Sequence, residues 1–177
     1  MQFTIYSLLR ASILMIATLA LVACSPSLNW REVRNDDASY TVLLPAKPAS
    51  HTRTVTLGEL KVEMQMTAAE ADDMNFAVAS ALVEDAGQRK NALELMQQAM
   101  VKNIRGSIAG EKTLMLKDGS SATEIEASGT MPNGRRMKLY ARFAMKEQRI
   151  YQAVAIGPED RLNAEIAETF LASFSLQ

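Results

Sequence analysis

Residues 121–157 read SATEIEASGTMPNGRRMKLYARFAMKEQRIYQAVAIG, and this stretch decides the fold class. Apolar and polar side chains alternate on both sides of the turn signal Pro132-Asn133-Gly134. A period of two with one apolar face is typical of half-buried β-strands. The stretch therefore predicts an antiparallel hairpin, and a further alternating run from Ile150 to Ile156 predicts another strand beside it.

The length of the turn sets the register of this hairpin. A two-residue Asn-Gly turn would place Ile125 opposite Arg142 and mix the apolar face with the polar one. A three-residue loop with Gly134 in a left-handed bulge places Glu124 opposite Arg142 and keeps the two faces separate. We therefore predict the longer loop, which also pairs Glu126 with Tyr140 and Ser128 with Lys138.

Strands are also predicted upstream of the hairpin. Residues 30–44 have the pattern of a first hairpin that ends at Pro45. Residues 51–67 alternate on both sides of a possible turn at Gly58-Glu59, whereas residues 76–83 are apolar on both faces. An apolar run of this kind predicts a central strand that is covered on both sides.

Two helices are predicted, one in the middle of the chain and one at its end. Asp85 and Gln88 have the spacing of a capping box, and Leu93, Met96, Met100 and Ile104 recur at helical steps after it. Gly106 is the expected C-terminal cap, and a strand is predicted from Glu111 to Lys117. The last helix is expected from about Arg161, with Leu162, Ile166 and Phe170 on its inner face.

The N-terminal segment has the anatomy of a secretory signal. One positive residue, Arg10, precedes an apolar run from Ala11 to Ala23, which is shorter than the roughly 20 residues of a spanning helix. Leu21-Val22-Ala23-Cys24 resembles the lipobox of bacterial lipoproteins. That resemblance implies cleavage before Cys24 and acylation of Cys24, and Ser25 after it favours the outer membrane. The predicted organisation is a signal peptide at 1–23, a lipidated tether at 24–28 and one domain at 29–177.

Composition limits the function classes that remain. The formal charge of the whole chain is only −1, so it has no strongly basic field and nucleic acid is an unexpected partner. Apolar residues make up 48% of the chain, which is enough for one packed domain. Cys24 is the only cysteine, so the fold has no internal disulfide and must be stabilised by packing.

The predicted order of elements is several strands, a helix, four strands and a terminal helix. This order indicates an α+β fold, with an antiparallel sheet of about seven or eight strands and two packed helices. The pattern resembles small PsbP-like domains, through Tyr40 to Pro45, Leu93 to Ile104, Arg136 to Gly157 and Phe170 to Leu176. The resemblance implies an accessory or binding role, and it supplies no site residues and no cofactor.

Three features of the sequence could carry chemistry. His51 is the only histidine and could serve a small hydrolase, but no nucleophile motif accompanies it. Met64 and Met66 share a strand face and could bind Cu(I), although core packing is the commoner role of methionine. Glu70, Asp72 and Asp73 lack the spacing of a calcium loop. We therefore predict no catalytic residue, no metal ligand and no cofactor.

The one concentrated basic feature lies on the hairpin, at Arg135, Arg136, Lys138 and Arg142. These residues could form an interaction surface for anionic headgroups or acidic glycans. The alternative is a solvated strand face that is balanced by Glu124 and Glu126. The overall expectation is a lipid-anchored, non-catalytic module of the periplasmic side that binds an envelope protein or glycan. A copper-handling protein and a small hydrolase are the alternatives.

Overall fold

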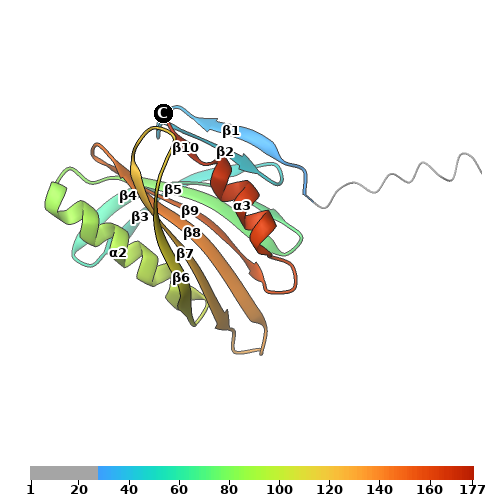
Figure 1. Ribbon diagram of the computed structural model, residues 1–177. Helices are drawn as coiled ribbons and strands as arrows, with labels where there is room; N and C mark the ends of the chain where they lie inside the picture. The colour runs from blue at the N-terminus through green and yellow to red at the C-terminus, as the bar shows by residue number, and fades with distance from the viewer. Residues whose placement is uncertain (1–27) are drawn as a thin grey trace, which may run out of the picture.

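The computed structural model describes residues 28–177, which form an α+β domain of two helices and ten strands (Figure 1). The helices are α2 (Ala86–Asn103) and α3 (Ala164–Ser173). The strands are β1 (Arg31–Asn35), β2 (Tyr40–Leu44), β3 (Ala49–Leu57), β4 (Leu60–Ala71), β5 (Met74–Leu82), β6 (Gly106–Met115), β7 (Ser121–Thr130), β8 (Arg136–Lys146), β9 (Arg149–Pro158) and β10 (Ser175–Leu176).

The main sheet has seven antiparallel strands in the order β3-β4-β5-β9-β8-β7-β6. A smaller sheet, β1-β2-β10, is separate from it, so the predicted first hairpin forms but does not extend the main sheet. One face of the main sheet packs against α2, and we call it the α2 face. The other face packs against α3 and the small sheet, and we call it the α3 face. Strand β5 lies inside the sheet with both faces buried, as predicted for a central strand.

The predicted register of the β7–β8 hairpin is confirmed. Glu124 pairs with Arg142, and Glu126 pairs with Tyr140. The amide of Met131 donates to the carbonyl of Arg135 at 2.9 Å, so residues 132–134 form the three-residue loop. Gly134 has φ +80°, which is the left-handed conformation that such a loop requires.

Helix α2 begins as predicted but ends earlier than predicted. The side chain of Asp85 accepts a hydrogen bond from the amide of Gln88, which caps the N-terminus. The C-terminal cap is Ile104 rather than Gly106, and Arg105 takes the left-handed conformation with φ +50°. Gly106 is instead the first residue of β6, so this strand starts before the predicted Glu111. Met96 and Ile104 are buried on the α2 face, with Leu93 and Met100 partly buried beside them.

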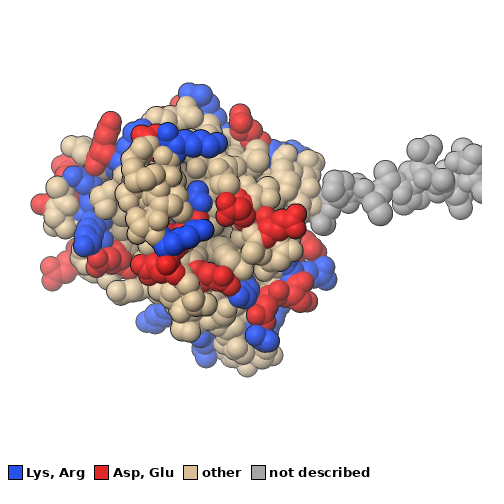
Figure 2. Space-filling view, in the orientation of Figure 1, with Lys and Arg blue, Asp and Glu red and all other residues tan. Residues whose placement is uncertain are grey.

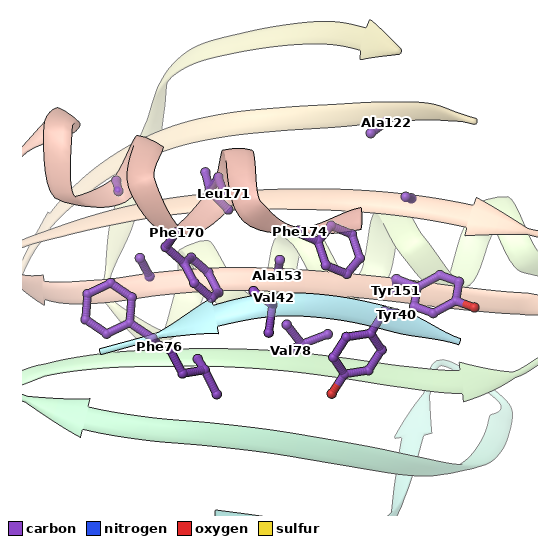
Figure 3. Close-up of a cluster of buried hydrophobic side chains, with 14 of the residues drawn as sticks. Tyr40, Val42, Phe76, Val78, Ala122, Tyr151, Ala153, Phe170, Leu171 and Phe174 are labelled. Carbon is purple, nitrogen blue, oxygen red and sulfur yellow. The ribbon is translucent and has the colours of Figure 1, made fainter. Parts of the chain in front are cut away.

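Helix α3 begins at Ala164, after Asn163 accepts a hydrogen bond from the amide of Ile166. The predicted start near Arg161 was therefore wrong, because Leu162 is buried in the turn that precedes the helix. Phe170 and Phe174 join an aromatic cluster between α3, β2 and the main sheet (Figure 3). The rings of Phe76 and Phe170 are 5.4 Å apart in an edge-on arrangement, which is favourable for aromatic pairs.

The predicted signal peptide at 1–23 and the lipidation site Cys24 lie outside the described residues, as does most of the tether at 24–28. Leu28 is described and packs, partly buried, against the α3-face core, so the packed domain includes this residue. Between residues 28 and 177 neither helix is long and apolar enough to span a bilayer.

Candidate functional site

A groove of about 360 Å³ lies on the α3 face, between β6, β7 and β8 on one side and α3 on the other. We call it the α3 groove. Leu171 and Ala167 of the helix form its apolar wall. Its charged lining residues are Glu111, Lys112, Glu124, Glu126 and Glu168. Acidic and basic side chains are interspersed over the molecular face in Figure 2.

Glu124 lies in the floor of this groove and forms a buried ion pair with Arg142 beneath it. The Nε of Arg142 donates to Oε2 of Glu124 at 3.0 Å, and the two side chains are only 7% and 11% exposed. The Nη1 of Arg142 donates to the carbonyl of Leu171 at 2.6 Å, in the last turn of α3. A cation at the C-terminal end of a helix is favoured by the helix dipole. Arg142 was predicted to face solvent, and this was wrong because α3 covers that side of β8.

Lys112 closes the floor from the solvent side. Its Nζ lies 2.8 Å from Oε1 of Glu124, while its own side chain is 64% exposed. Burial opposes ionisation of Glu124, but hydrogen bonds from Lys112 and Arg142 outweigh it and lower the pKa of the Glu124 carboxyl. The same hydrogen bond raises the pKa of Lys112. The Glu124 carboxylate and the Lys112 ammonium therefore stay charged together at neutral pH.

A second charged cluster lies next to the first on β7 and β8. Lys138 bonds to Oε1 of Glu126, and the hydroxyl of Tyr140 donates to the same oxygen at 3.4 Å. The hydrogen bond from Lys138 to Glu126 raises the pKa of Lys138. Burial, reinforced by the charge of Glu126, raises the pKa of Tyr140. Tyr140 therefore stays neutral and keeps its proton as a hydrogen-bond donor.

The other two residues of the predicted basic surface lie at the tip of the β7–β8 hairpin. Arg135 pairs with Asp73 at 3.0 Å and Arg136 pairs with Glu159 at 2.8 Å. All four predicted cations thus have carboxylate partners. Lys138 and Arg142 pair with Glu126 and Glu124 of the groove without lining it themselves, and Arg135 and Arg136 lie on the exposed tip. Whether the four act as an interaction surface stays a prediction.

His51 lies on β3, at an edge of the main sheet, and its side chain is exposed. It is the register partner of Met66, so the two share the α2 face. The neighbouring Ser50 hydroxyl is on the opposite face, 2.9 Å from the hydroxyl of Thr67. Among the described residues no hydrogen bond joins His51 to a carboxylate or a hydroxyl.

The two methionines of the copper alternative lie in or against the hydrophobic core. Met64 is only 5% exposed in the cluster under α2, and Met66 packs against the same cluster. Core packing by adaptable side chains explains both positions. Asp72 and Asp73 form the β4–β5 turn and pair with Arg161 and Arg135. In residues 28–177 no three His, Cys, Asp or Glu side chains gather in a way that could hold a metal ion.

Sequence reasoning identified Glu124 and Glu126 but not the groove itself or its residues on β6 and α3. The signal was present in the alternation of Glu124 and Glu126 with apolar residues, facing Arg142 and Lys138 across the register. It indicated an ion-paired strand face, but nothing local to β7 or β8 shows that a helix from the end of the chain covers that face.

The domain is an α+β protein with a PsbP-like fold. It is similar to the cyanobacterial PsbP (CyanoP) from Synechocystis sp. PCC 6803, with a TM-score of 0.55 and 12% sequence identity, over 89% of this chain and 99% of that chain. At this identity the likeness concerns the fold alone. The predicted resemblance to PsbP-like domains is confirmed at that level.

Two other solved structures are less similar. A putative regulator of unknown function from Pseudomonas aeruginosa has a TM-score of 0.38 and 13% identity, over 62% of this chain and 85% of that chain. A protein from Bacteroides thetaiotaomicron has a TM-score of 0.46 and 12% identity, over 83% of this chain and 48% of that chain. The sequence matches no family model and no curated protein.

Proposed function

We propose that this protein is a lipid-anchored accessory module of the bacterial envelope, which binds a partner without chemistry of its own. The observation that carries the proposal is the α3 groove, whose charged floor is held by Arg142, Glu124 and Lys112. Because these side chains already have partners, a ligand meets fixed charges and little side-chain entropy is lost on binding. A floor with fixed charges favours binding of a partner with complementary charge.

The anchor is acylated Cys24, which holds the domain on the periplasmic side of the outer membrane. Leu28 already packs against the core. Three residues lie between Leu28 and Cys24, so the four Cα-to-Cα steps of this tether span at most about 15 Å when extended. A domain held this close to the bilayer has a high effective concentration toward other envelope components, which lets a weak interface act.

The partner is an envelope protein or a glycan. The copper and hydrolase alternatives gain no support, because Met64 is buried in the core and His51 stands alone on an exposed strand. The fold of the similar CyanoP structure fits an accessory role, although the likeness carries no function by itself.

The test is complementation of a deletion strain, combined with a pull-down of the lipidated protein from native membranes. Glu168→Lys changes the charge at the rim of the groove on an exposed residue, and Arg136→Glu with Lys138→Glu reverses the hairpin cations. We expect one or both to reduce function and partner recovery, while His51→Ala is silent. All variants must be folded and reach the membrane. Loss of function with His51→Ala, together with full activity of the charge variants, would contradict the binding proposal and favour the hydrolase alternative.

A further inference from the structure

Strand β6 is the last strand of the main sheet, and within residues 28–177 no other strand pairs with its outer edge (Figure 1). A bulge interrupts its pairing with β7 between Ile108 and Gly110. After the bulge, the strand runs regularly from Gly110 to Met115. An exposed edge of this length is a template for pairing with another polypeptide.

The direction of the free backbone groups follows from the hydrogen bonds of the β6–β7 pair. The amide of Leu116 donates to the carbonyl of Ser120 at 2.8 Å, in register with the pairs of β6. In an antiparallel ladder such bonded pairs alternate with non-bonded ones. The amides of Lys112 and Leu114 therefore point toward β7. Those of Glu111, Thr113 and Met115 point outward.

This edge has a groove on each side of it. Gly110, Glu111 and Lys112 of β6 line the α3 groove. A second groove of about 670 Å³, the α2 groove, lies between α2 and β6 and includes Ile108, Glu111 and Val101. Successive side chains of a strand point to opposite faces of a sheet, so those of an added strand would fall over the two grooves in turn.

The two grooves differ in chemistry. Of the four glutamates that line the α3 groove, Glu124 is paired with Arg142 and Lys112, and Glu126 with Lys138, whereas Glu111 and Glu168 have no ion pair among the described residues. Its rim therefore favours a positive side chain. On the other side, Ile108 is one of the few large apolar side chains that stay exposed, at 42%. In the α2 groove Glu94 and Glu111 are balanced in charge by Lys102 and Arg105, and Val101 and Ile108 supply the apolar surface. An apolar side chain of an added strand would pack against that surface.

We propose that β6 is the docking edge for an extended segment of a partner protein, which adds to the sheet as a further strand. The segment has a basic side chain over the α3 groove and an apolar one over the α2 groove. Main-chain hydrogen bonds to the outward amides supply affinity, and the alternating grooves supply specificity. This rests on the proposed binding function and narrows its partner to a polypeptide.

The opposite edge of the sheet, β3, provides a matched control. Leu57 pairs with Leu60 across Gly58 and Glu59, and Gly58 has φ +62° at the first turn position. In a hairpin with a two-residue turn, the pair next to the turn, here Leu57 and Leu60, exchanges backbone hydrogen bonds. Hydrogen-bonded and non-hydrogen-bonded pairs alternate along the strand, so the amide of Thr54 points outward. Thr54 and Thr113 are both exposed threonines on edge strands. Proline at either position removes the outward-pointing backbone amide but leaves the hydrogen bonds to the neighbouring strand intact.

The experiment uses the soluble domain from residue 25 onward, first shown to be folded, and a synthetic peptide of about ten residues that alternates lysine with valine. Binding is measured by NMR titration and by amide hydrogen exchange. We expect slowed exchange at Glu111, Thr113 and Met115. Thr113→Pro should weaken binding by at least about tenfold, whereas Thr54→Pro should not. Methylation of alternate backbone nitrogens of the peptide should weaken binding as much as Thr113→Pro does. Replacing the lysines of the peptide with glutamate should also weaken binding.

A photo-crosslinking side chain at position 113 or 54 extends the test to cells. We expect position 113 to capture an extended segment with the basic and apolar alternation, and Thr54 to capture none. Equal binding of the methylated peptide, exchange protection at β3, or no binding at about 1 mM would overturn strand addition. Concentration-dependent dimers that Thr113→Pro abolishes would instead make a second copy the occupant and overturn the partner assignment. None of these outcomes tests lipid anchoring or complementation, so the proposed function is judged separately by those two measurements.

Discussion

Arg142 shows how one side chain ties three elements together. Its guanidinium bonds to Glu124 on β7 and to the carbonyl of Leu171 on α3, while its backbone belongs to β8. Taking two charges out of water is costly, so such a pair is weak support for stability by itself. Its structural contribution is one of position, because the hydrogen bond to the carbonyl of Leu171 connects the last turn of α3 to β8.

Removing one partner of the buried pair should therefore be damaging. We expect Arg142→Met to lower the free energy of unfolding by about 3 to 5 kcal/mol, because the carboxylate of Glu124 loses a buried counter-ion. Arg136→Met is the matched control, since the Arg136 side chain is 73% exposed, and we expect it to change stability by no more than about 0.5 kcal/mol. Urea unfolding followed by circular dichroism measures both. Equal midpoints for the two variants would contradict the role of Arg142.

The depressed pKa of Glu124 predicts a pH dependence. In the unfolded chain a glutamate titrates near pH 4.3, and in the folded protein Glu124 titrates lower. Its contribution is therefore fully present above about pH 5 and is lost as the pH falls through the folded pKa. We expect Glu124→Gln to be less stable than wild type at pH 6 and to lose less stability between pH 6 and pH 3. Parallel pH profiles of the two unfolding midpoints would show that Glu124 is not the titrating group.

At the scale of elements, the end of α2 and the hairpin below it depend on two glycines. Gly106 of β6 pairs with Gly129 of β7, and the backbone of Ile104 passes directly above them. A Cβ placed on Gly129 would lie 2.0 Å from the carbonyl oxygen of Ile104. That atom belongs to the backbone, so the clash can be relieved only by moving α2 or the strand.

We expect Gly129→Ala to destabilise the protein by about 1 to 3 kcal/mol or more, as overpacking does elsewhere. Gly110 is the control on the neighbouring strand, because a Cβ there meets no atom within 4 Å. Gly110→Ala should be close to neutral, within about 0.5 kcal/mol. Thermal unfolding of both variants decides the matter. A stable Gly129→Ala protein would mean that the end of α2 can shift freely.

At the scale of the whole molecule, the proposed function depends on where the domain is held. The proposed membrane attachment is the acylated Cys24. A single acyl chain binds a bilayer marginally, whereas two or more hold stably. The lipid is thus expected to decide the location of a domain whose own net charge is small.

Cys24→Ala should leave an uncleaved or mislocalised precursor, because the sulfur that carries the lipid is missing. Labelling with a palmitate analogue, membrane fractionation and mass spectrometry of the native protein measure this. Wild type should carry the label in the outer-membrane fraction, and Cys24→Ala should carry none. An unmodified thiol on Cys24 in mature native protein would rule the anchor out.

Much of the fold could be predicted from local pattern. The alternation in residues 121–157 predicted the hairpin, and the choice between two loops predicted its register, since only one loop keeps Met137, Leu139 and Ala141 on a common face with Ile125. The N-terminal capping residues of α2, Asp85 and Gln88, were equally local. In these cases neighbouring residues in the chain carry both the pattern and the contact that satisfies it.

The sequence by itself thus determined most of the strands, the presence of two helices and the pairing of Glu124 with Arg142, because each depends on short-range periodicity. The tertiary structure decided what covers the second face of the sheet. Period two separates a polar face from an apolar one, but it does not say whether water or a distant helix lies over the polar one. Burial of Arg142, the early start of β6 at Gly106 and the groove beside α3 all depend on how residues far apart in the chain pack together.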